Sequence, residues 1–513
     1  MKRIALLFLI LVSACKPNIT TPSSTFTPTS LPSTSIPTLT PEPPITFPAD
    51  INPLTGQPVT DPSLLKVPAL LISISNFPAS GRPQAGLSFA PFVYEIYITE
   101  GSTRFLSIFY GEYPAPEIPT AGGCIVRSGA FVQTQNIVGG RTWLDANNNG
   151  TRDAEERGVG GVCVNLYDPS GNLLQQTTTD SNGYYGFNVQ PGKYIVQFVK
   201  PAGFDFTKQN TGDESNNSNA DPATGLAEAD VQSNVLSLGA GLGPSPNQTP
   251  VQNPSTYLPL AQVGPIRSGR LIYAYISSFF KNSCLIYAFA SPEVLARLSQ
   301  CHMVFHQIMG GGYMMDISEM KAVAEKNRGQ KGSDFDYASN TFAEQSPAGG
   351  APATKLNVYI AYQNQSGWMY DPLYQSYLRY TDTSEMADAG ILYPDTDRLT
   401  GRQLHFENVI VLFAKHDVVS PTNLDIHLDQ GRIGNALLFR DGQMYKITWS
   451  TRASDDRNRS RKNHPIIFLD ANGEPFPLKP GHTWVLVVTP DSTVGEKSPG
   501  AWQLQFAFPP GAK

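Results

Sequence analysis

The stretch DANNNGTRDAEE, from Asp145 to Glu156, has the oxygen spacing of an EF-hand calcium loop. An EF-hand needs a helix on each side of this loop. Here the flanking sequences are strand-like instead: IVGGRTWLD precedes the loop, and in GVCVNLYD after it Val162, Val164 and Leu166 alternate with other residues. The stretch therefore predicts a structural calcium clamp inside a β-domain and not a helix–loop–helix sensor.

The predicted calcium ligands are oxygen atoms, as this cation requires. Five are side chains and one is a backbone carbonyl: Asp145, Asn147, Asn149, Asp153 and Glu156, with the carbonyl of Thr151. Gly150 permits the sharp turn in the middle of the loop. Because only three of the side chains are carboxylates, we expect modest affinity, of about 10⁻⁴ to 10⁻³ M as in extracellular modules. The alternative is an Asx-rich turn that binds no metal.

Short strands continue after the loop. LLQQTTT, YYGFNV and KYIVQFVKP have strand-forming composition, and the SGN and DSNG segments between them are typical turns. Strands separated by turns at this regular spacing predict a β-sandwich.

The segment from Val138 to Leu242 resembles the B-type repeat of staphylococcal Sdr surface proteins, which has a Cna-B-like immunoglobulin-type fold. The resemblance implies that this module binds calcium and serves as a stiffened spacer. Its acidic closing segment, TGDESNNSNADPATGLAEADV, contains a second candidate metal site formed by Asp213, Glu214 and Asp221. A solvated acidic loop is the alternative for those three residues.

The first residues predict export. MKRIALLFLILVSAC has a basic start, a short apolar core and small residues before Cys15, so it is a secretory signal. Its ending resembles a bacterial lipobox, which implies that Cys15 carries lipid and anchors the protein to the outer face of the membrane. The alternative is ordinary signal-peptide cleavage near Ala14. The next segment consists almost wholly of Ser, Thr and Pro, and we expect it to be a disordered stalk.

Composition fits an exported protein. Only 16% of the 513 residues are charged, and the formal charge of −6 argues against the basic surface that nucleic-acid binding requires. Besides Cys15 there are four cysteines, for which nearest-neighbour pairing (Cys124 with Cys163, Cys284 with Cys301) is favoured. Four cysteines allow three connectivities, and buried free thiols are the alternative.

The sequence on both sides of the sandwich is similar to the YerB-like bacterial lipoprotein family, whose domains have no assigned function. The resemblance rests on segments such as ALLISISNFP, TRFLSIFY, VGPIRSGR and GRIGNALLFRDGQMYKITWS. In that family TRFLSIFY-like sequence is soon followed by IGPIRSGR-like sequence, so the sandwich is predicted to be inserted into one loop of a host domain.

The resulting prediction is a multidomain protein: an α+β host interrupted by an all-β immunoglobulin-like sandwich and followed by a mostly β C-terminal domain. The predicted parts are a signal peptide (1–14), a stalk (15–48), the first part of the host N-terminal domain (49–118), the sandwich (137–243), the second part of the host N-terminal domain (257–350) and a C-terminal domain (351–513). Two host helices are expected, one starting after Ser291 and one capped by Asp316 or Ser318 and stopped by Gly329.

Ligand-binding candidates are polar residues within the segments that carry the YerB-like resemblance. They are Asn76, Arg82, Gln84, Glu95, Glu100, Arg104, Arg267, Ser268 and Arg270. The RPQ, TRF and GPIRSGR segments are predicted to converge, because the inserted loop joins two of them. Arginine suits bidentate binding of carboxylate or phosphate. The alternative is an internal salt network in which these arginines pair with Glu95 and Glu100.

Catalytic motifs are weak. His302 and His306 lack the glutamate of a zincin helix, the sequence contains no GxSxG or P-loop motif, and RNRSRKNH is expected to be a solvated basic loop. We therefore predict a membrane-anchored extracytoplasmic lipoprotein that binds or scaffolds a cell-wall polymer or envelope protein. The alternatives are an envelope enzyme using Glu95 or Glu100, and a surface adhesin.

Overall fold

The structure is a computed structural model that describes residues 45–116, 136–180, 182–201, 203–245, 261–299, 301–304, 308–309, 311–372, 374–382, 392–457 and 463–512. The predicted signal peptide, Cys15, nearly all of the predicted stalk, Cys124 and His306 lie outside these residues. Across the ranges just given, no helix is both long and apolar enough to cross a membrane.

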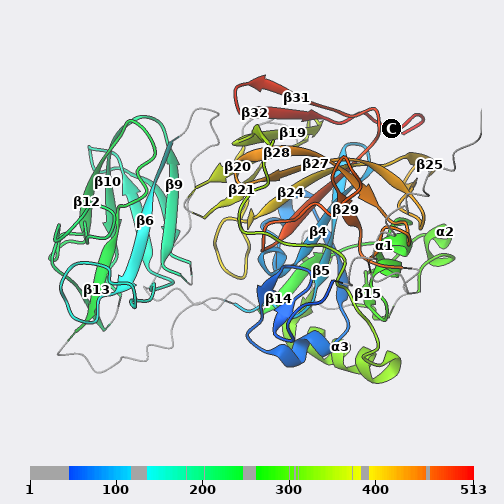
Figure 1. Cartoon of the computed structure of the whole chain (residues 1–513), viewed down its shortest axis with the longest axis horizontal. Coiled ribbons are helices and arrows are strands. Elements are labelled where there is room, and N and C mark those ends of the chain that lie inside the picture. The colour runs from blue at the N-terminus through cyan, green and yellow to red at the C-terminus, as the bar shows by residue number, and fades with distance from the viewer. Residues whose placement is uncertain are drawn as a thin grey trace, which may run out of the picture. The chain divides into compact units, whose positions relative to one another are not determined.

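The sandwich consists of two four-stranded sheets (Figure 1). One has the order β12 (Leu226–Val231), β10 (Gly192–Phe198), β7 (Cys163–Tyr167) and β8 (Leu173–Thr178); the other has the order β11 (Phe204–Phe206), β13 (Ala240–Pro244), β6 (Asn136–Leu144) and β9 (Tyr184–Val189). Burial alternates along β9 and β12, as expected for strands with one face on a core. Inward residues such as Val164, Tyr185 and Val196 form that core. The predicted immunoglobulin-like architecture is confirmed.

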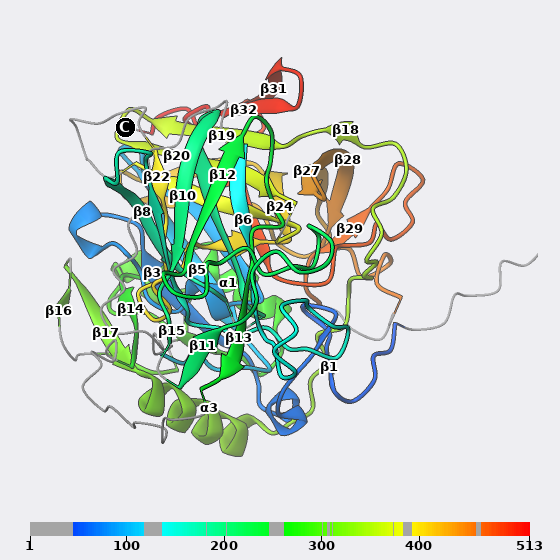
Figure 2. The same ribbon diagram turned by 90° about the vertical axis from the view of Figure 1, so that its left-hand side faces the viewer.

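The host contains a large mixed sheet whose strands come from both sides of the sandwich in sequence (Figure 2). Its order is β16 (Ile308–Met309), β17 (Gly312–Asp316), β14 (Gln262–Ile266), β3 (Leu70–Ser75), β5 (Ser102–Phe109), β4 (Phe92–Thr99), β30 (Thr483–Val488), β24 (Asn408–Phe413), β27 (Ile433–Arg440), β28 (Gln443–Ser450) and β18 (Ala351–Pro352). Two short strands join it off this path: β15 (Cys284–Ile286) pairs with β3, and β29 (Ile467–Leu469) pairs with β28.

This sheet continues across the predicted boundary at residue 350. Strand β4 of the N-terminal part pairs in parallel with β30 of the C-terminal part, from Phe92 opposite Thr483 to Ile96 opposite Val487. Both strands are buried almost throughout. The two host parts therefore share one hydrogen-bonded sheet and one apolar core.

A second host sheet comes from the C-terminal part. Its order is β22 (Tyr393–Pro394), β21 (Ser376–Thr381), β20 (Asn364–Asp371), β19 (Lys355–Ala361), β32 (Ala501–Gln505) and β31 (Thr493–Ser498), and β23 (His405–Phe406) pairs with β21. Two small hairpins complete the described strands: β1 (Ile51–Asn52) with β2 (Gln57–Pro58), and β25 (His416–Ser420) with β26 (Asn423–Ile426).

The host helices are α1 (Tyr273–Phe279), α2 (Pro292–Leu295) and α3 (Ile317–Lys331). Ser291 is the N-cap residue of α2 and Asp316 that of α3, as predicted. The predicted stop of α3 at Gly329 is wrong: the helix continues to Lys331 and ends at Gly332, whose φ is 78°. Glycine lowers helix propensity by only about 1 kcal/mol, whereas Gly332 takes the positive φ that glycine adopts without steric cost.

The sandwich lies in the chain between two strands that flank the same neighbour. Strand β5 precedes it, β14 follows it, and both pair antiparallel with β3. The side chains of Pro114, before the insertion, and of Val263, after it, both lie beside Gly86. The ends of the host that receive the insertion are therefore close in space, as a tolerated domain insertion requires.

One predicted disulfide is confirmed: Cys284 and Cys301 are bonded, with their Cα atoms 5.3 Å apart. Cys163 is also disulfide-bonded. Its predicted partner, Cys124, falls outside the described residues, so that pairing stays a prediction.

Candidate functional site

Two segments that flank the sandwich in sequence meet across β3. Arg104 of β5 pairs with Ser75 of β3, and Ile266 of β14 pairs with the adjacent Ile74. The chain after β14 stays on this edge, because the Arg267 N–H donates to the Ser73 carbonyl oxygen at 3.0 Å. The TRF and GPIRSGR segments therefore converge.

Three arginines line a hollow at this convergence, which we call the three-arginine hollow. Its volume is about 320 Å³, roughly an order of magnitude above what a single water needs. The lining residues are Phe77, Pro78, Ile98, Thr99, Ser102, Arg104, Arg267, Arg270 and Gln363. No Asp or Glu of the described residues belongs to this lining, which combines an apolar wall with three cationic side chains.

The guanidinium groups of the hollow do not use all of their hydrogen-bond donors. Arg104 is only 4% exposed, and its Nη1 donates to the backbone oxygen of Ser268 at 3.1 Å and to its hydroxyl at 3.0 Å. Arg270 donates to the Gly269 carbonyl oxygen at 3.2 Å, and Arg267 contacts that of Gly311. The Nε atoms of all three arginines are buried without a hydrogen-bond partner.

The charge of the hollow is also uncompensated. Among the described residues, none of the three arginines forms an ion pair with a carboxylate. Burial, together with the neighbouring guanidinium of Arg270, lowers the pKa of Arg104 to about 9, so Arg104 remains a cation at neutral pH. Burial also lowers the pKa of Arg267 and of Arg270. Unpaired buried charge is costly, and an anion in the hollow would relieve that cost.

Four other candidates hold the fold around the hollow. The Asn76 amide donates to the Thr103 hydroxyl at 2.7 Å, and the Gln84 amide donates to the Ser75 carbonyl oxygen at 2.9 Å. Arg82 pairs with Asp382 at 3.2 Å. Ser268 accepts from Arg104, as described above, and so positions it.

The two glutamates take other roles. Glu95 is 2% exposed and accepts from Thr103 at 2.8 Å and from the Trp484 indole at 3.1 Å, while its ion-pair partner is Arg379 at 3.5 Å. Glu100 lies in the β4–β5 turn with φ 49°, where its carbonyl oxygen accepts from Gln363. The alternative of a salt network between these glutamates and Arg104, Arg267 or Arg270 does not form in the described residues.

Sequence reasoning missed the other walls of the hollow. Gln363 comes from the turn between β19 and β20, far along the chain, and no local pattern links it to Arg104. Phe77 and Pro78 adjoin the predicted Asn76, and Ile98 precedes the β4–β5 turn. From the sequence alone, these apolar residues cannot be distinguished from ordinary core residues.

The DANNNGTRDAEE loop turns its predicted ligands inward. Asp145 is fully buried, and its two carboxylate oxygens accept from the N–H groups of Asn149, at 3.1 Å, and of Gly150, at 2.7 Å. The side chains of Asn147 and Asn149 both donate to one carboxylate oxygen of Asp153, at 2.9 and 3.1 Å. Glu156 reaches back across the loop to the N–H groups of Ala146 and Asp153, both at 3.0 Å.

This arrangement is compatible with a cation that takes oxygen ligands. Five side chains of the predicted set crowd one loop, and every one of them carries an oxygen. Thr151 is fixed by its N–H, which donates to Asn149 at 2.7 Å. Across the described ranges, no three His, Cys, Asp or Glu side chains come together as a metal group. A calcium site here would therefore depend on amide and backbone oxygens beside the carboxylates.

The second candidate metal site is not assembled. One Asp221 carboxylate oxygen accepts from the N–H groups of Ala223 and Thr224 and so caps its own turn. The Asp213 carbonyl oxygen accepts from the N–H groups of Asn216 and Asn217. No contact joins Asp221 to Asp213 or Glu214 in the part of the chain that the structure describes, which favours a structured acidic loop.

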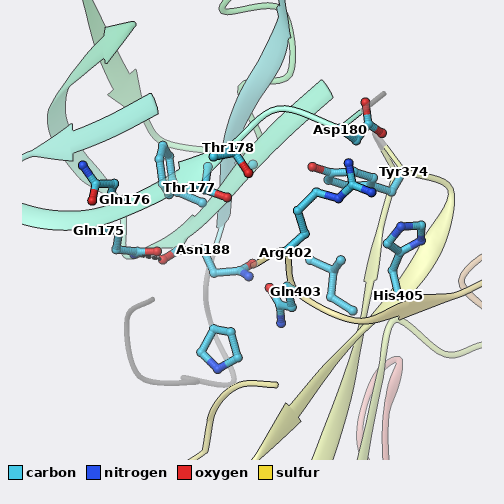
Figure 3. A pocket seen from close by; sticks show the side chains of 14 residues that line it. Gln175, Gln176, Thr177, Thr178, Asp180, Asn188, Tyr374, Arg402, Gln403 and His405 are labelled. Atoms are coloured by element: carbon cyan, nitrogen blue, oxygen red, sulfur yellow. Dashed lines mark hydrogen bonds between the residues drawn. The ribbon is translucent and has the colours of Figure 1, made fainter. Parts of the chain in front are cut away.

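A smaller hollow is lined by side chains of β8 and β9 and by residues near β21 and β23, among them Tyr374, Arg402 and His405 (Figure 3). Its volume of about 40 Å³ holds only a few waters. Its one carboxylate, Asp180, accepts from the N–H groups of Asn182 and Tyr184 and thereby caps its own turn. This hollow offers no carboxylate pair for acid–base chemistry.

His302 has a structural partner as well. Its Nε2 lies 2.9 Å from a carboxylate oxygen of Glu319, on helix α3. Its predicted companion, His306, is outside the described residues, as is most of the basic run RNRSRKNH.

Family models match three regions of the chain. An SdrD B-like domain covers residues 136–241, and the N- and C-terminal domains of a protein of unknown function (DUF3048) cover residues 54–128 and 356–485. The B-like domain thus lies between the two DUF3048 domains, and both family resemblances predicted from the sequence are confirmed.

Two of the curated relatives each match about a fifth of the chain. Serine-aspartate repeat-containing protein F of Staphylococcus epidermidis is 40% identical over 95 residues, which are 18% of this chain and 6% of that protein. Serine-aspartate repeat-containing protein D of Staphylococcus aureus is 36% identical over 116 residues, 22% of this chain and 9% of that protein. The chain therefore spans less than a tenth of the length of either relative.

Among solved structures, the YerB protein from Bacillus subtilis aligns over 85% of this chain and 96% of that chain, with 16% identity and a TM-score of 0.44.

These features define a class: a multidomain protein with an immunoglobulin-like module inserted into a larger host. Within that class, the chain carries an N-terminal and a C-terminal DUF3048 domain with an SdrD B-like domain between them.

Proposed function

We propose that the protein is an extracytoplasmic lipoprotein whose host binds an anionic component of the cell envelope in the three-arginine hollow. The observation that carries this proposal is that three arginines line the hollow while no Asp or Glu of the described residues does. A purely structural arginine cluster would be expected to include its own carboxylates. The predicted partner, a cell-wall polymer or an anionic envelope protein, has the required charge.

The enzyme alternative has weaker support. Its proposed acid–base residues were Glu95 and Glu100, and neither lines the hollow. Glu95 is sealed in the core by Thr103, Trp484 and Arg379. General acid–base catalysis needs a carboxyl group that reaches the substrate.

The binding proposal predicts the loss of ligand in an arginine variant that still folds. Full-length protein immobilised on beads is incubated with envelope extract, and bound material is quantified by mass spectrometry. Arg267→Ala is expected to lower recovery at least tenfold, since a hydrogen bond to a charged group is worth about 1.5–3 kcal/mol. Arg267 is half-exposed, so its removal should leave the melting temperature nearly unchanged.

The matched control is Arg432→Ala. Arg432 is an exposed arginine paired with Asp429 and absent from the hollow, so recovery should equal that of the wild type. Equal recovery by Arg267→Ala and wild type would contradict the proposal, as would loss of the fold in both Arg267→Ala and Arg104→Ala.

Membrane attachment through Cys15 is part of the same proposal. Acyl chains on this cysteine would hold the protein at the outward-facing side of the membrane, with the Ser/Thr/Pro-rich segment as a stalk. Cys15→Ser is expected to move the protein from the membrane fraction to the soluble fraction and to abolish incorporation of radiolabelled fatty acid. Absence of label from the wild-type protein would contradict lipidation, and retention of Cys15→Ser in the membrane fraction would contradict the lipid as the anchor.

The inserted sandwich is proposed to be a calcium-stiffened spacer. The clustering of the Asp145, Asn147, Asn149, Asp153 and Glu156 side chains within one loop supports this role, with the Thr151 carbonyl as a further ligand. Calcium would supply positive charge among the carboxylates, and the loop residues would lose conformational freedom around it.

A further inference from the structure

The three-arginine hollow has a charge that one carboxylate cannot balance. Three guanidinium groups share it, and among the described residues no acidic side chain lines it. A bound monocarboxylate would balance only one of the three positive charges. A phosphomonoester group carries a charge of about −1.5 to −2 at neutral pH, which balances more of the positive charge of the three guanidinium groups.

The number of free donors points the same way. Each of the three arginines has a buried Nε–H group with no acceptor. A monoester phosphate presents three terminal oxygens, each a strong acceptor, whereas a carboxylate presents two oxygens. Arginine binds such oxygens through paired N–H groups of one guanidinium. Three guanidinium groups lining one hollow therefore match a group with three acceptor oxygens better than a group with two.

The rest of the lining indicates what the phosphoryl group is attached to. Phe77, Pro78 and Ile98 form an apolar wall, and Thr99, Ser102 and Gln363 contribute polar groups. The volume of about 320 Å³ lies at the lower end of the range for small-molecule sites, of roughly 300–1,000 Å³. Inorganic phosphate alone would leave this wall uncovered.

We propose that the three-arginine hollow binds a phosphomonoester group carried on an organic moiety that packs against Phe77 and Pro78. This inference rests on the proposed anion-binding function and narrows its ligand class. The phosphomonoester has two possible sources, the headgroup of a membrane lipid and a soluble phosphorylated molecule, and both share the chemistry that the arginines recognise.

The test uses probes matched in their organic part. Phenyl phosphate and benzoate are titrated calorimetrically into the full-length protein at fixed ionic strength. Phenyl phosphate is expected to bind at least tenfold more tightly than benzoate. In Arg267→Gln and Arg270→Gln the affinity for phenyl phosphate should fall at least tenfold, whereas in Arg432→Gln it should not change.

A second arm distinguishes the two sources. Vesicles containing phosphatidic acid, a monoester, are compared with vesicles containing phosphatidylglycerol, a diester, in a flotation assay with the Cys15→Ser variant. Flotation with phosphatidic acid vesicles but not with phosphatidylglycerol vesicles, lost when Arg267→Gln or Arg270→Gln is added, indicates a lipid headgroup. Binding of phenyl phosphate without flotation indicates a soluble ligand.

The outcomes separate this inference from the broader proposal. Benzoate binding equal to or tighter than phenyl phosphate binding would overturn the phosphomonoester assignment and leave anion binding intact. Phenyl phosphate binding that is unchanged in both arginine variants would overturn the assignment to this hollow. Binding of neither probe would overturn the inference, and recovery from envelope extract would then decide the broader proposal independently.

Discussion

Replacing Arg379 with alanine is expected to lower the free energy of unfolding of the host by about 3–5 kcal/mol. Arg379 is fully buried on β21, where it contacts the Asp395 carboxylate and lies 3.5 Å from that of Glu95. Its guanidinium also packs over Trp484, 4.6 Å from the ring centroid. The alanine variant would leave two buried carboxylates without their cation. Urea unfolding followed by tryptophan fluorescence measures the change.

Two controls separate this network from a general effect of losing arginine. Arg432→Ala removes an exposed arginine paired with Asp429 and should cost less than about 1 kcal/mol. The triple variant Arg379→Met, Glu95→Gln, Asp395→Asn removes all three charges together and should recover part of the loss, because no carboxylate stays unpaired. A change below about 1 kcal/mol in Arg379→Ala would contradict the role assigned to it.

Arg379 also illustrates which part of the fold the sequence could not reveal. The strands themselves were predictable, because β3 and β4 are rich in β-branched and aromatic residues and β9 and β12 alternate in burial with a period of two. Their partners were not. The parallel pairing of β4 with β30 joins residues almost four hundred positions apart, and no local pattern encodes such a register. The shared sheet therefore became visible only in three dimensions.

The candidate site shows the same division. Arg104, Arg267 and Arg270 were predicted to converge because a family resemblance placed TRF and GPIRSGR on either side of one inserted module. The choice between a ligand and an internal salt network depended on where Glu95 points. That glutamate is directed to Arg379, whose strand lies far along the chain, so sequence spacing could not decide between the two.

Asp145→Ala is expected to destabilise the inserted sandwich even without metal. Its carboxylate accepts from two backbone N–H groups, of Asn149 and Gly150, and Asp145 is fully buried. Each donor left without an acceptor costs about 1–3 kcal/mol, so the sum is about 2–6 kcal/mol. Asp145→Asn keeps one acceptor oxygen and should lose roughly half as much. Differential scanning calorimetry of the full-length protein resolves the transition of the sandwich.

Calcium adds a second, separable effect on the same transition. For a dissociation constant of about 10⁻⁴ to 10⁻³ M, 10 mM calcium should stabilise wild-type sandwich by about 1.4–2.7 kcal/mol relative to chelator. Both Asp145 variants should lose this response, since each removes a carboxylate ligand. Asp168→Ala is the matched control: Asp168 caps an exposed turn of the same sandwich, away from the loop, and the response should persist there. A wild-type transition that does not move with chelator would show that the loop is a hydrogen-bonded turn without calcium. Loss of the response in both Asp145 variants, together with its persistence in Asp168→Ala, would assign the response to this loop.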